Sequence, residues 1–216
     1  NIPILYFAFE DSAPRFMSRQ GAIHGSYDLL TLRNPLMPPN FLPNHERCMD
    51  EVSKLPIYVE DMPTTVDKLC RKIEWYKRKH GIEGVVIDGL KDIILTEGEN
   101  QTNKEGAVNA ALVTASKLND VAILTISHLT KIEEDGWISR RNIRGTDTQN
   151  SSARMVLVFQ DAGIPSQIRQ DYGAYGDEIV LDCQKSSYSH RSITALDMDL
   201  TRGMFTEKER QQGVTL

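Results

Sequence analysis

Three short apolar runs of the chain each end in a side chain that can do chemistry. Glu10 follows "YFAF", Asp88 ends "GVVID", and Ser127 with His128 follows "AILTI". A carboxylate at a strand end can hold hydrated Mg²⁺ beside a nucleotide phosphate, and a second acid can deprotonate an attacking water. Each residue alone also has a simpler role, as a turn cap, a helix-start carboxylate or a structural hydrogen-bonding group. Their shared position after three apolar runs favours the chemical interpretation.

The first of these residues lies between a predicted strand and a predicted helix. The run "IPILYFAF" is typical of a buried strand, and Asp11 or Ser12 then caps a helix. The apolar face of this helix comprises Ala13, Phe16, Met17, Gln20 and Ile23. The stretch "NPLMPPNFLPNHE" (34–46) has too much Pro and Asn for regular structure and predicts a surface excursion. "LPIYVEDMP" (55–63) is the next predicted strand.

The other candidate residues follow strands that further helices separate. Thr64 or Thr65 opens a helix, which "KRKHG" ends with a basic last turn and a Gly stop. Its apolar side comprises Val66, Leu69, Cys70, Ile73 and Tyr76. After the strand "GVVID" (84–88) comes a predicted polar loop, "TEGENQTNKEG" (96–106). The helix "AVNAALVTASKLND" (107–120) then leads into the strand "VAILTIS" (121–127).

Strands that are apolar throughout and alternate with amphipathic helices predict an α/β fold with a parallel sheet covered on both faces. The later runs "RMVLVFQD", "DEIVLDCQ" and "SITALDMD" have no helices between them and predict antiparallel strands added at one edge. Loops at the carboxyl ends of parallel strands open a crevice. We therefore expect Glu10, Asp88 and His128 to meet at that edge.

Composition narrows the classes of protein that the chain can belong to. With 216 residues, 40% hydrophobic and 25% charged, the chain is typical of a globular protein with a substantial core. Its apolar runs stay well below about 20 residues, so no membrane span is predicted. Three cysteines without a CxxC pair favour a reduced, cytoplasmic setting. The net charge of -5 restricts contact with a polyanion to particular loops. The start "NIPILYFAFE", without Met or signal peptide, is typical of a fragment.

Five stretches of the chain carry a family resemblance: "YFAFEDS", "LPIYVEDMPTTVDKLCRKIEWYKRKHGIEGVVIDGLKDI", "VAILTISHLTK", "RNIRGTDTQNSSARMVLVFQD" and "EIVLDCQKSSYSHRSITALDMDLTRGMFTE". In order and in spacing, these stretches resemble the ATPase domain of DnaB-type hexameric replicative helicases. They look most like the phage primase-helicases, are also similar to plasmid RepA-like helicases, and run from about residue 4 to 205. The resemblance implies one RecA-like motor domain over 1–216 that uses ATP and Mg²⁺ and moves along single-stranded DNA.

The same resemblance implies partners and a place of action. Such motors are helicases of the 5′–3′ type that assemble as hexameric rings and work with a primase and a polymerase. The expected setting is the cytoplasm of a bacterial host, with the gene carried by a phage or another mobile element.

The resemblance also implies roles for single residues. Asp88 corresponds to the Walker B acid, which acts on Mg²⁺ and its water shell, and Glu10 to the base that polarises the attacking water. His128, in "ISHL", falls where the family has a polar γ-phosphate sensor that is coupled to a DNA-binding loop. Lys185, in "QKSS", matches a lysine that reaches toward the nucleotide of the neighbouring subunit.

Two departures from the family pattern affect the expected activity. No GxxxxGK[ST] loop occurs in the 216 residues, and the family places it one strand and helix before Ile4. Either a preceding segment carries this loop, which the abrupt start favours, or nucleotide binding is lost. The family also has an arginine two residues after the lysine, where this chain has Ser187. An arginine finger contributes roughly 10³ to 10⁵ in rate; Arg191 either replaces it or is a solvated charge in a hairpin turn.

DNA contacts are expected from two loops that face the channel of the ring, at 95–106 and 130–150. The second loop contains four cationic residues that can track a single-stranded backbone: Lys131, Arg140, Arg141 and Arg144. Trp137 in this loop is expected to pack locally rather than to stack on a base. Two other classes of function stay open: a RecA-like structural or DNA-binding subunit without hydrolysis, and a RecA-type recombinase that forms filaments.

Overall fold

The computed structural model describes residues 1–28, 30–31, 38–93, 101–128, 138–139, 152–160, 179–188, 190, 192–199 and 204–207, with only the backbone for 101–105. The chain divides into two compact units, 1–128 and 129–216. Each unit is described by itself. That the two together make one motor domain stays a prediction.

The first unit is built on a parallel sheet of four strands in the order β2-β1-β3-β4. The strands are β1 (Ile4–Ala8), β2 (Ile57–Glu60), β3 (Gly84–Asp88) and β4 (Ala122–Ile126). The register pairs Ala8 with Asp88 and Asp88 with Ile126. Three neighbouring strands therefore end at the same level, which confirms the predicted parallel α/β arrangement.

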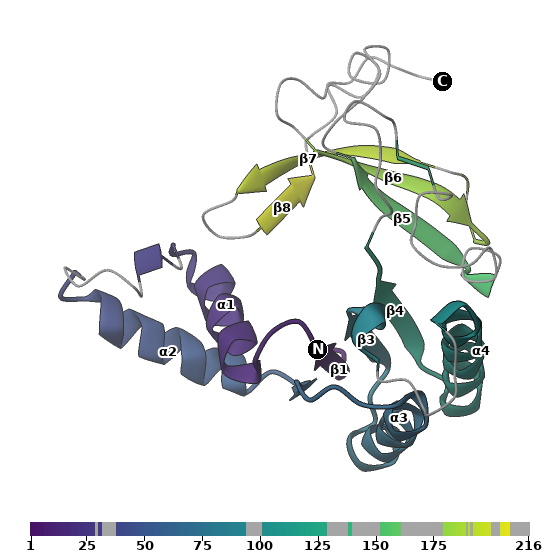
Figure 1. Cartoon of the computed structure of the whole chain (residues 1–216). Coiled ribbons are helices and arrows are strands. Elements are labelled where there is room, and N and C mark those ends of the chain that lie inside the picture. Colours follow the sequence, from purple (N-terminus) through teal and green to yellow (C-terminus); the bar gives the residue numbers. More distant parts are fainter. Residues whose placement is uncertain are drawn as a thin grey trace. The chain divides into compact units, whose positions relative to one another are not determined.

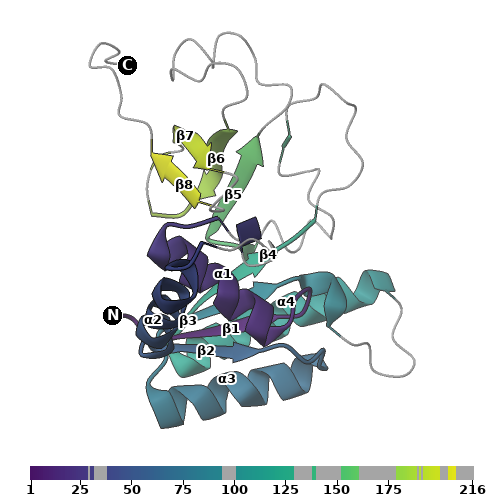
Figure 2. The ribbon, with the colours of Figure 1, turned by 90° about the vertical axis from the view of Figure 1, so that its left-hand side faces the viewer.

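Two helices, α3 (Val66–His80) and α4 (Gln101–Asn119), lie side by side over one face of this sheet (Figures 1 and 2). Alternation along β1 turns Leu5 and Phe7 into the core beneath these helices and Tyr6 to the opposite face. There the Tyr6 ring lies 4.3 Å from that of Phe16 in α1 (Ala13–Gly25). The buried core also includes Leu69, Ile73, Ile82, Val85, Ile87, Ile93, Val108, Leu112 and Val121.

The predicted parallel sheet flanked by helices is confirmed, while one face of the edge strand β4 is exposed in the described residues. Leu124 and Ile126 are 55% and 43% exposed, while Ile123 beside Leu124 packs against the core. Strands of parallel sheets are usually buried on both faces. An apolar run alone does not distinguish a strand with two covered faces from one with a single covered face.

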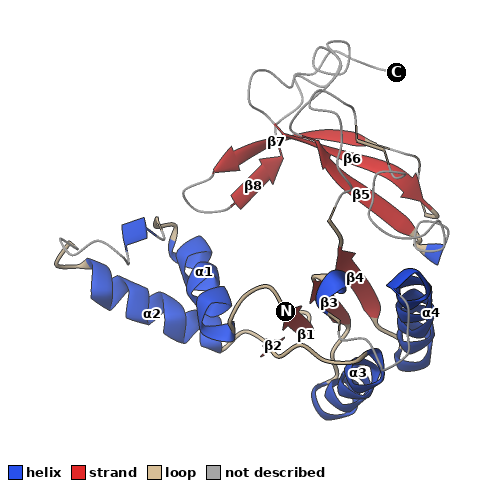
Figure 3. Ribbon diagram, in the orientation of Figure 1, coloured by secondary structure: helices blue, strands red, loops and turns tan. Residues whose placement is uncertain are grey.

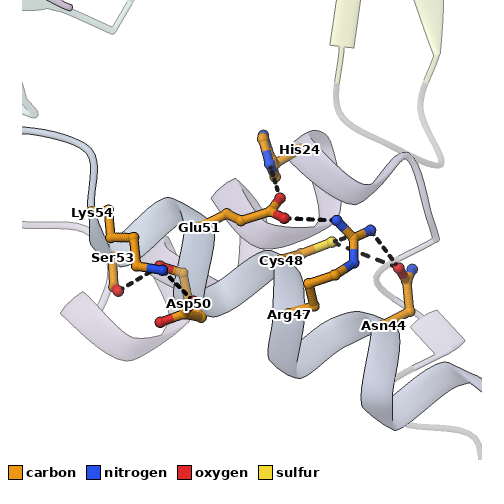
Figure 4. Close-up of polar contacts among 8 residues, drawn as sticks. All are labelled: His24, Asn44, Arg47, Cys48, Asp50, Glu51, Ser53 and Lys54. Atoms are coloured by element: carbon orange, nitrogen blue, oxygen red, sulfur yellow. Dashed lines mark hydrogen bonds and ion pairs between the residues drawn. The ribbon is translucent and has the colours of Figure 1, made fainter.

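Helix α2 (Phe41–Ser53) corrects the prediction of an irregular excursion over 34–46 from residue 41 onward, while 34–37 lie outside the described residues. Pro43 falls in the first turn of the helix, where a missing N–H breaks no intrahelical bond. Phe41 and two later residues of α2, Cys48 and Val52, are buried at helical spacing. The Glu51 carboxylate of α2 accepts hydrogen bonds from Arg47 Nη1 and from His24 Nε2 of α1, both at 2.7 Å, and so joins the two helices (Figure 4).

Helix α4 begins earlier in the structure than the sequence predicts. This helix begins at Gln101, six residues before the predicted start at 107 and inside the predicted polar loop. Gln, Lys and Glu are good helix formers even where no apolar residue marks the period. None of the helices in the described ranges is both long and apolar enough to span a membrane.

The second unit contains an antiparallel sheet in the order β5-β6-β7-β8 (Figure 3). Its strands are β5 (Met155–Gln160), β6 (Ile179–Ser186), β7 (Ile193–Asp199) and β8 (Met204–Glu207). The antiparallel character is confirmed, and in the described residues these strands form a sheet of their own. The fully buried Gln160 side chain bonds both the N–H (2.9 Å) and the C=O (2.6 Å) of Ile138. This amide holds residue 138 of the predicted DNA-contacting stretch against β5.

Two glycines are expected to respond to alanine substitution with opposite signs. Gly81 ends α3 in the left-handed region (φ 65°) with its N–H on the Lys77 carbonyl, so Gly81→Ala should destabilise the fold by about 1 kcal/mol. Gly106 lies inside α4 with open space at the Cβ position, so Gly106→Ala should stabilise by about 0.5–1 kcal/mol. Urea unfolding measures both values, and shifts of the same sign would contradict these backbone assignments.

Candidate functional site

The candidate site lies where β1, β3 and β4 end. Asp88 is the last residue of β3, and Glu10 and His128 each follow two residues after the end of a flanking strand. The Phe9 N–H donates to the Asp88 carbonyl at 2.7 Å, which extends the pairing of β1 and β3 up to the site. The expected convergence of Glu10, Asp88 and His128 at one edge of the sheet is therefore present.

Two cationic or protonatable groups hold one oxygen of the Glu10 carboxylate. Oε1 lies 2.7 Å from His128 Nε2 and 3.0 Å from Lys91 Nζ. The hydrogen bond from His128 and then that from Lys91 hold the pKa of Glu10 below its ordinary value. Oε2 has no partner among the described residues, and the side chain is 34% exposed. The carboxylate is thus oriented through one oxygen while the other can accept a proton.

A tyrosine orients the second carboxylate. The Tyr6 hydroxyl donates a hydrogen bond of 3.0 Å to Asp88 Oδ2 across the pair β1–β3. Burial, and next the charge of Asp88, raise the pKa of Tyr6 far above its ordinary range, so this hydroxyl stays protonated and acts as a donor. The peptide that follows, Asp88–Gly89, is cis.

The turn after β3 brings a further acid to the site. Asp92 Oδ2 is buried and has no hydrogen-bond partner in the described part of the chain. A Cβ at Gly89 would lie 2.8 Å from Glu10 Oε1 and 3.6 Å from Asp92 Oδ2, so the backbone approaches both carboxylates closely. Only glycine fits this position without moving Glu10.

These residues fit Mg²⁺ better than a metal with a full set of protein ligands. The described ranges contain no group of three or more His, Cys, Asp or Glu residues that could hold a metal ion. Mg²⁺ is usually bound by one or two carboxylates, with water and phosphate oxygens as its other ligands. Asp88 would hold the ion or its water shell.

The other predicted site residues belong to the second unit, whose position relative to this edge is not described. Lys185 lies in β6 of the second unit, where it pairs with Val156 of β5. The remaining predicted residues lie outside the described residues: Lys131, Arg140, Arg141, Arg144 and Arg191. Trp137 is also among them. Their roles stay predictions.

Three residues that contribute to the site are not singled out by the sequence. The sequence does contain a signal for Tyr6, because side chains alternate along a strand and Tyr6 falls on the face that points away from the core. Lys91 and Asp92 have none, since their approach to Glu10 and Gly89 depends on the short helix η2 (Leu90–Asp92) that follows β3.

The parallel sheet, its flanking helices and the acids at the strand ends define a RecA-like α/β domain. Residues 1–156 match the family described as DnaB-like helicase C terminal domain, and the chain belongs to this family. No curated protein matches the chain.

Two solved structures share the fold at 16% sequence identity each. One is described as an "ATPase Domain", with a TM-score of 0.83, 96% of this chain covered and 75% of that chain covered. The other is "The Structure Of A DnaB-Like Replicative Helicase And Its Interactions With Primase", with a TM-score of 0.81 and 96% of this chain covered. This chain spans about half of the second one's length, 52%.

Removing the Lys91 charge is expected to raise the pKa of Glu10 toward its ordinary value of 4.5. In Lys91→Met the carboxylate loses one of the two groups that favour its charged form. A carboxyl group whose pKa is lower in the folded than in the unfolded protein stabilises the fold at pH values above the unfolded-state pKa. This stabilisation is lost as the pH falls through the folded-state pKa. The variant should therefore lose less stability than the parent protein on acidification below about 4.5.

Carbon-13 NMR titration of the Glu10 carboxyl measures this shift directly. Lys54→Met removes another exposed lysine, which pairs with Asp50 in α2, and serves as the control. An unchanged Glu10 pKa in Lys91→Met would exclude the contact between Lys91 and Glu10.

Proposed function

We propose that this chain is the motor domain of a replicative DNA helicase of the 5′–3′ type, which hydrolyses ATP to move along single-stranded DNA. The observation that supports it is the meeting of Glu10, Asp88 and His128 at one sheet edge, in a member of the DnaB-like helicase family. Crevices at the carboxyl ends of parallel strands are the usual position of ligand sites in such sheets.

In this proposal Glu10 is the general base of hydrolysis. Its oxygen Oε2 takes a proton from the water that attacks the γ-phosphorus, the bond to the β-phosphate oxygen breaks, and ADP leaves. His128 and Lys91 hold Oε1 and fix the direction of Oε2. Bound Mg²⁺ would neutralise the charge that develops on the phosphate oxygens.

Tyr6 has a positioning role toward Asp88. Its hydroxyl occupies one lone pair of Oδ2 and so restrains the orientation of the Asp88 carboxylate. His128 contacts Glu10 from the end of β4, so a change in the γ-phosphate that moves His128 also moves the base. We propose that this contact links hydrolysis to the stretch that begins after residue 128.

The proposal extends to assembly and partners. Subunits form a hexameric ring in which Lys185 and Arg191 approach the nucleotide of a neighbour. The loop cations contact single-stranded DNA: Lys131, Arg140, Arg141 and Arg144. A primase is a partner class because one of the similar structures is that of a DnaB-like replicative helicase with its interactions with primase; a polymerase is proposed from the family resemblance.

The proposed place of action is the cytoplasm of a bacterial host, with the gene carried by a phage or another mobile element. The three free cysteines are in keeping with a reducing compartment.

A second candidate is a RecA-like subunit that binds DNA or supports an assembly without hydrolysis. The observation that favours it is the lack of a GxxxxGK[ST] motif in the 216 residues. A RecA-type recombinase is the third class, and it would form filaments rather than closed rings.

One experiment separates these candidates. ATP turnover and unwinding of a forked duplex are measured with and without single-stranded DNA, and mass photometry records the size of the assembly. The helicase proposal expects DNA-stimulated turnover, unwinding and a closed oligomer. DNA binding that needs no nucleotide and is not accompanied by ATP turnover would favour the structural subunit over the helicase. Open-ended assemblies on DNA would favour the recombinase.

A further inference from the structure

One exposed face of α3 combines a tryptophan with a row of cations, in a chain whose net charge is -5. We call the set Lys68, Arg71, Trp75, Arg78 and Lys79 the α3 stripe. Spacings of three and four residues place them on one side of the helix, opposite the buried Leu69 and Ile73. The stripe runs about 16 Å along the helix at 1.5 Å per residue.

The Trp75 indole is held in place although it is 49% exposed. Its ring lies edge-on to Tyr76, with centroids 4.7 Å apart, and to His80 at 5.7 Å. Tyr76 in turn donates a hydrogen bond of 3.0 Å to Glu60 Oε1 of β2. Burial, and next this hydrogen bond, raise the pKa of Tyr76 to about 12. His80 stacks on Tyr58 of β2 at 4.2 Å. The indole is therefore a supported aromatic surface and not a loose side chain.

The cations of the stripe are only partly neutralised by neighbouring acids. Arg78 pairs with Glu74 on the same helix, and the Lys79 ammonium lies 4.4 Å from the Trp75 ring centroid. The ion pairs formed by α3 in the described residues involve Lys72 and Arg78 and not Lys68 or Arg71, although the exposed Asp67 lies in the same first turn. Two exposed charges beside an exposed indole thus stand outside these ion pairs, which leaves them available to an anionic ligand.

We propose that the α3 stripe binds single-stranded nucleic acid, with a base stacked on Trp75 and backbone phosphates on Lys68 and Arg71. Aromatic rings between cations are the combination that binds single strands without reading their sequence. An acidic peptide would satisfy the cations but would leave the supported indole without a planar partner. The stripe shares no residue with the loops at 95–106 and 130–150, and only the choice of DNA as ligand rests on the proposed function.

Tryptophan fluorescence tests the stripe directly. The chain has two tryptophans, so a Trp137→Phe background makes Trp75 the sole emitter. Titration with oligothymidylate at low salt, without nucleotide, is expected to quench Trp75 emission in a saturable way. The double variant Lys68→Glu, Arg71→Glu should weaken this binding by about tenfold or more. It should also reduce the salt slope of log affinity by about 1.4, or 0.7 for each lost phosphate contact.

A matched variant controls for overall charge. Arg47→Glu in α2 with Lys54→Glu at its C-cap makes the same change in net charge at two exposed side chains, and should leave Trp75 quenching within about twofold of the parent. Circular dichroism checks that both double variants are folded.

Three outcomes would overturn the proposal. The first is unchanged Trp75 emission while labelled oligothymidylate still binds. The second is an equal loss of oligothymidylate binding in the two double variants. The third is binding of polyglutamate as tight as that of oligothymidylate. None of them bears on ATP turnover, which is measured separately, so failure of the stripe is distinct from failure of the motor assignment.

Discussion

Glu10→Gln is expected to lower ATP turnover by about 10² to 10⁴-fold in a form of the protein that hydrolyses ATP. The amide cannot take the proton of the attacking water, although it still fills the same space between His128 and Lys91. Nucleotide affinity should stay within about threefold of the parent, because the substitution leaves Asp88 and the strand ends intact. Steady-state turnover and binding of a fluorescent nucleotide measure the two quantities.

The chain offers a closely matched control for this substitution. Glu51 in α2 is also held by a histidine and a cation, His24 and Arg47, and these contacts also lower its pKa (Figure 4). Glu51→Gln therefore removes a carboxylate of similar electrostatic setting away from the strand ends, and turnover should be unchanged. Turnover that survives in Glu10→Gln, or falls equally in both variants, would remove Glu10 from the role of base.

Asp88→Asn is expected to lower turnover by about 10²-fold or more and to raise the Mg²⁺ concentration required for half-maximal rate. Asn keeps the size of the side chain and one acceptor oxygen but has no charge to hold the ion or its water shell. Tyr6→Phe removes only the hydrogen bond to Oδ2, so its effect should have the same direction and be much smaller.

Turnover as a function of Mg²⁺ concentration measures the effect of Asp88→Asn. Asp50→Asn, in the exposed pair of Asp50 with Lys54, is the control and should leave both rate and Mg²⁺ dependence unchanged. An Asp88→Asn variant with parental Mg²⁺ dependence would show that this carboxylate is only the cap of the turn after β3.

The parallel sheet could be predicted because its strands and helices carry clear periodic patterns. The spacing of Leu69 and Ile73 and the Gly81 stop define α3 to within one residue. Helix α2 could not be predicted, because prolines and asparagines at 34–46 hide the spacing of its buried residues. The start of α4 is polar, and β8 is only four residues long, so neither carries enough periodicity to be recognised.

Some residues of the candidate site could likewise be predicted from the sequence, and others could not. Glu10, Asp88 and His128 could be predicted to lie together because parallel strands in register bring successive strand ends to one edge. Lys91 and Asp92 reach the site through the turn after β3, whose path a sequence pattern does not specify. The contact of Tyr6 with Asp88 needs the order of the strands as well, since it joins neighbours that are 82 positions apart.

Paramagnetic NMR with Mn²⁺ in place of Mg²⁺ tests most directly whether the three residues share one nucleotide–metal site, because carboxylate and water ligands suit both ions. In the ATP-hydrolysing form of the protein, bound Mn²⁺–nucleotide should broaden the side-chain signals of Glu10, Asp88 and His128 together, while the signal of Glu51 stays sharp. Sharp signals from Asp88 or Glu10 at saturating Mn²⁺–nucleotide would contradict the account, because the ion and the phosphates would then lie elsewhere.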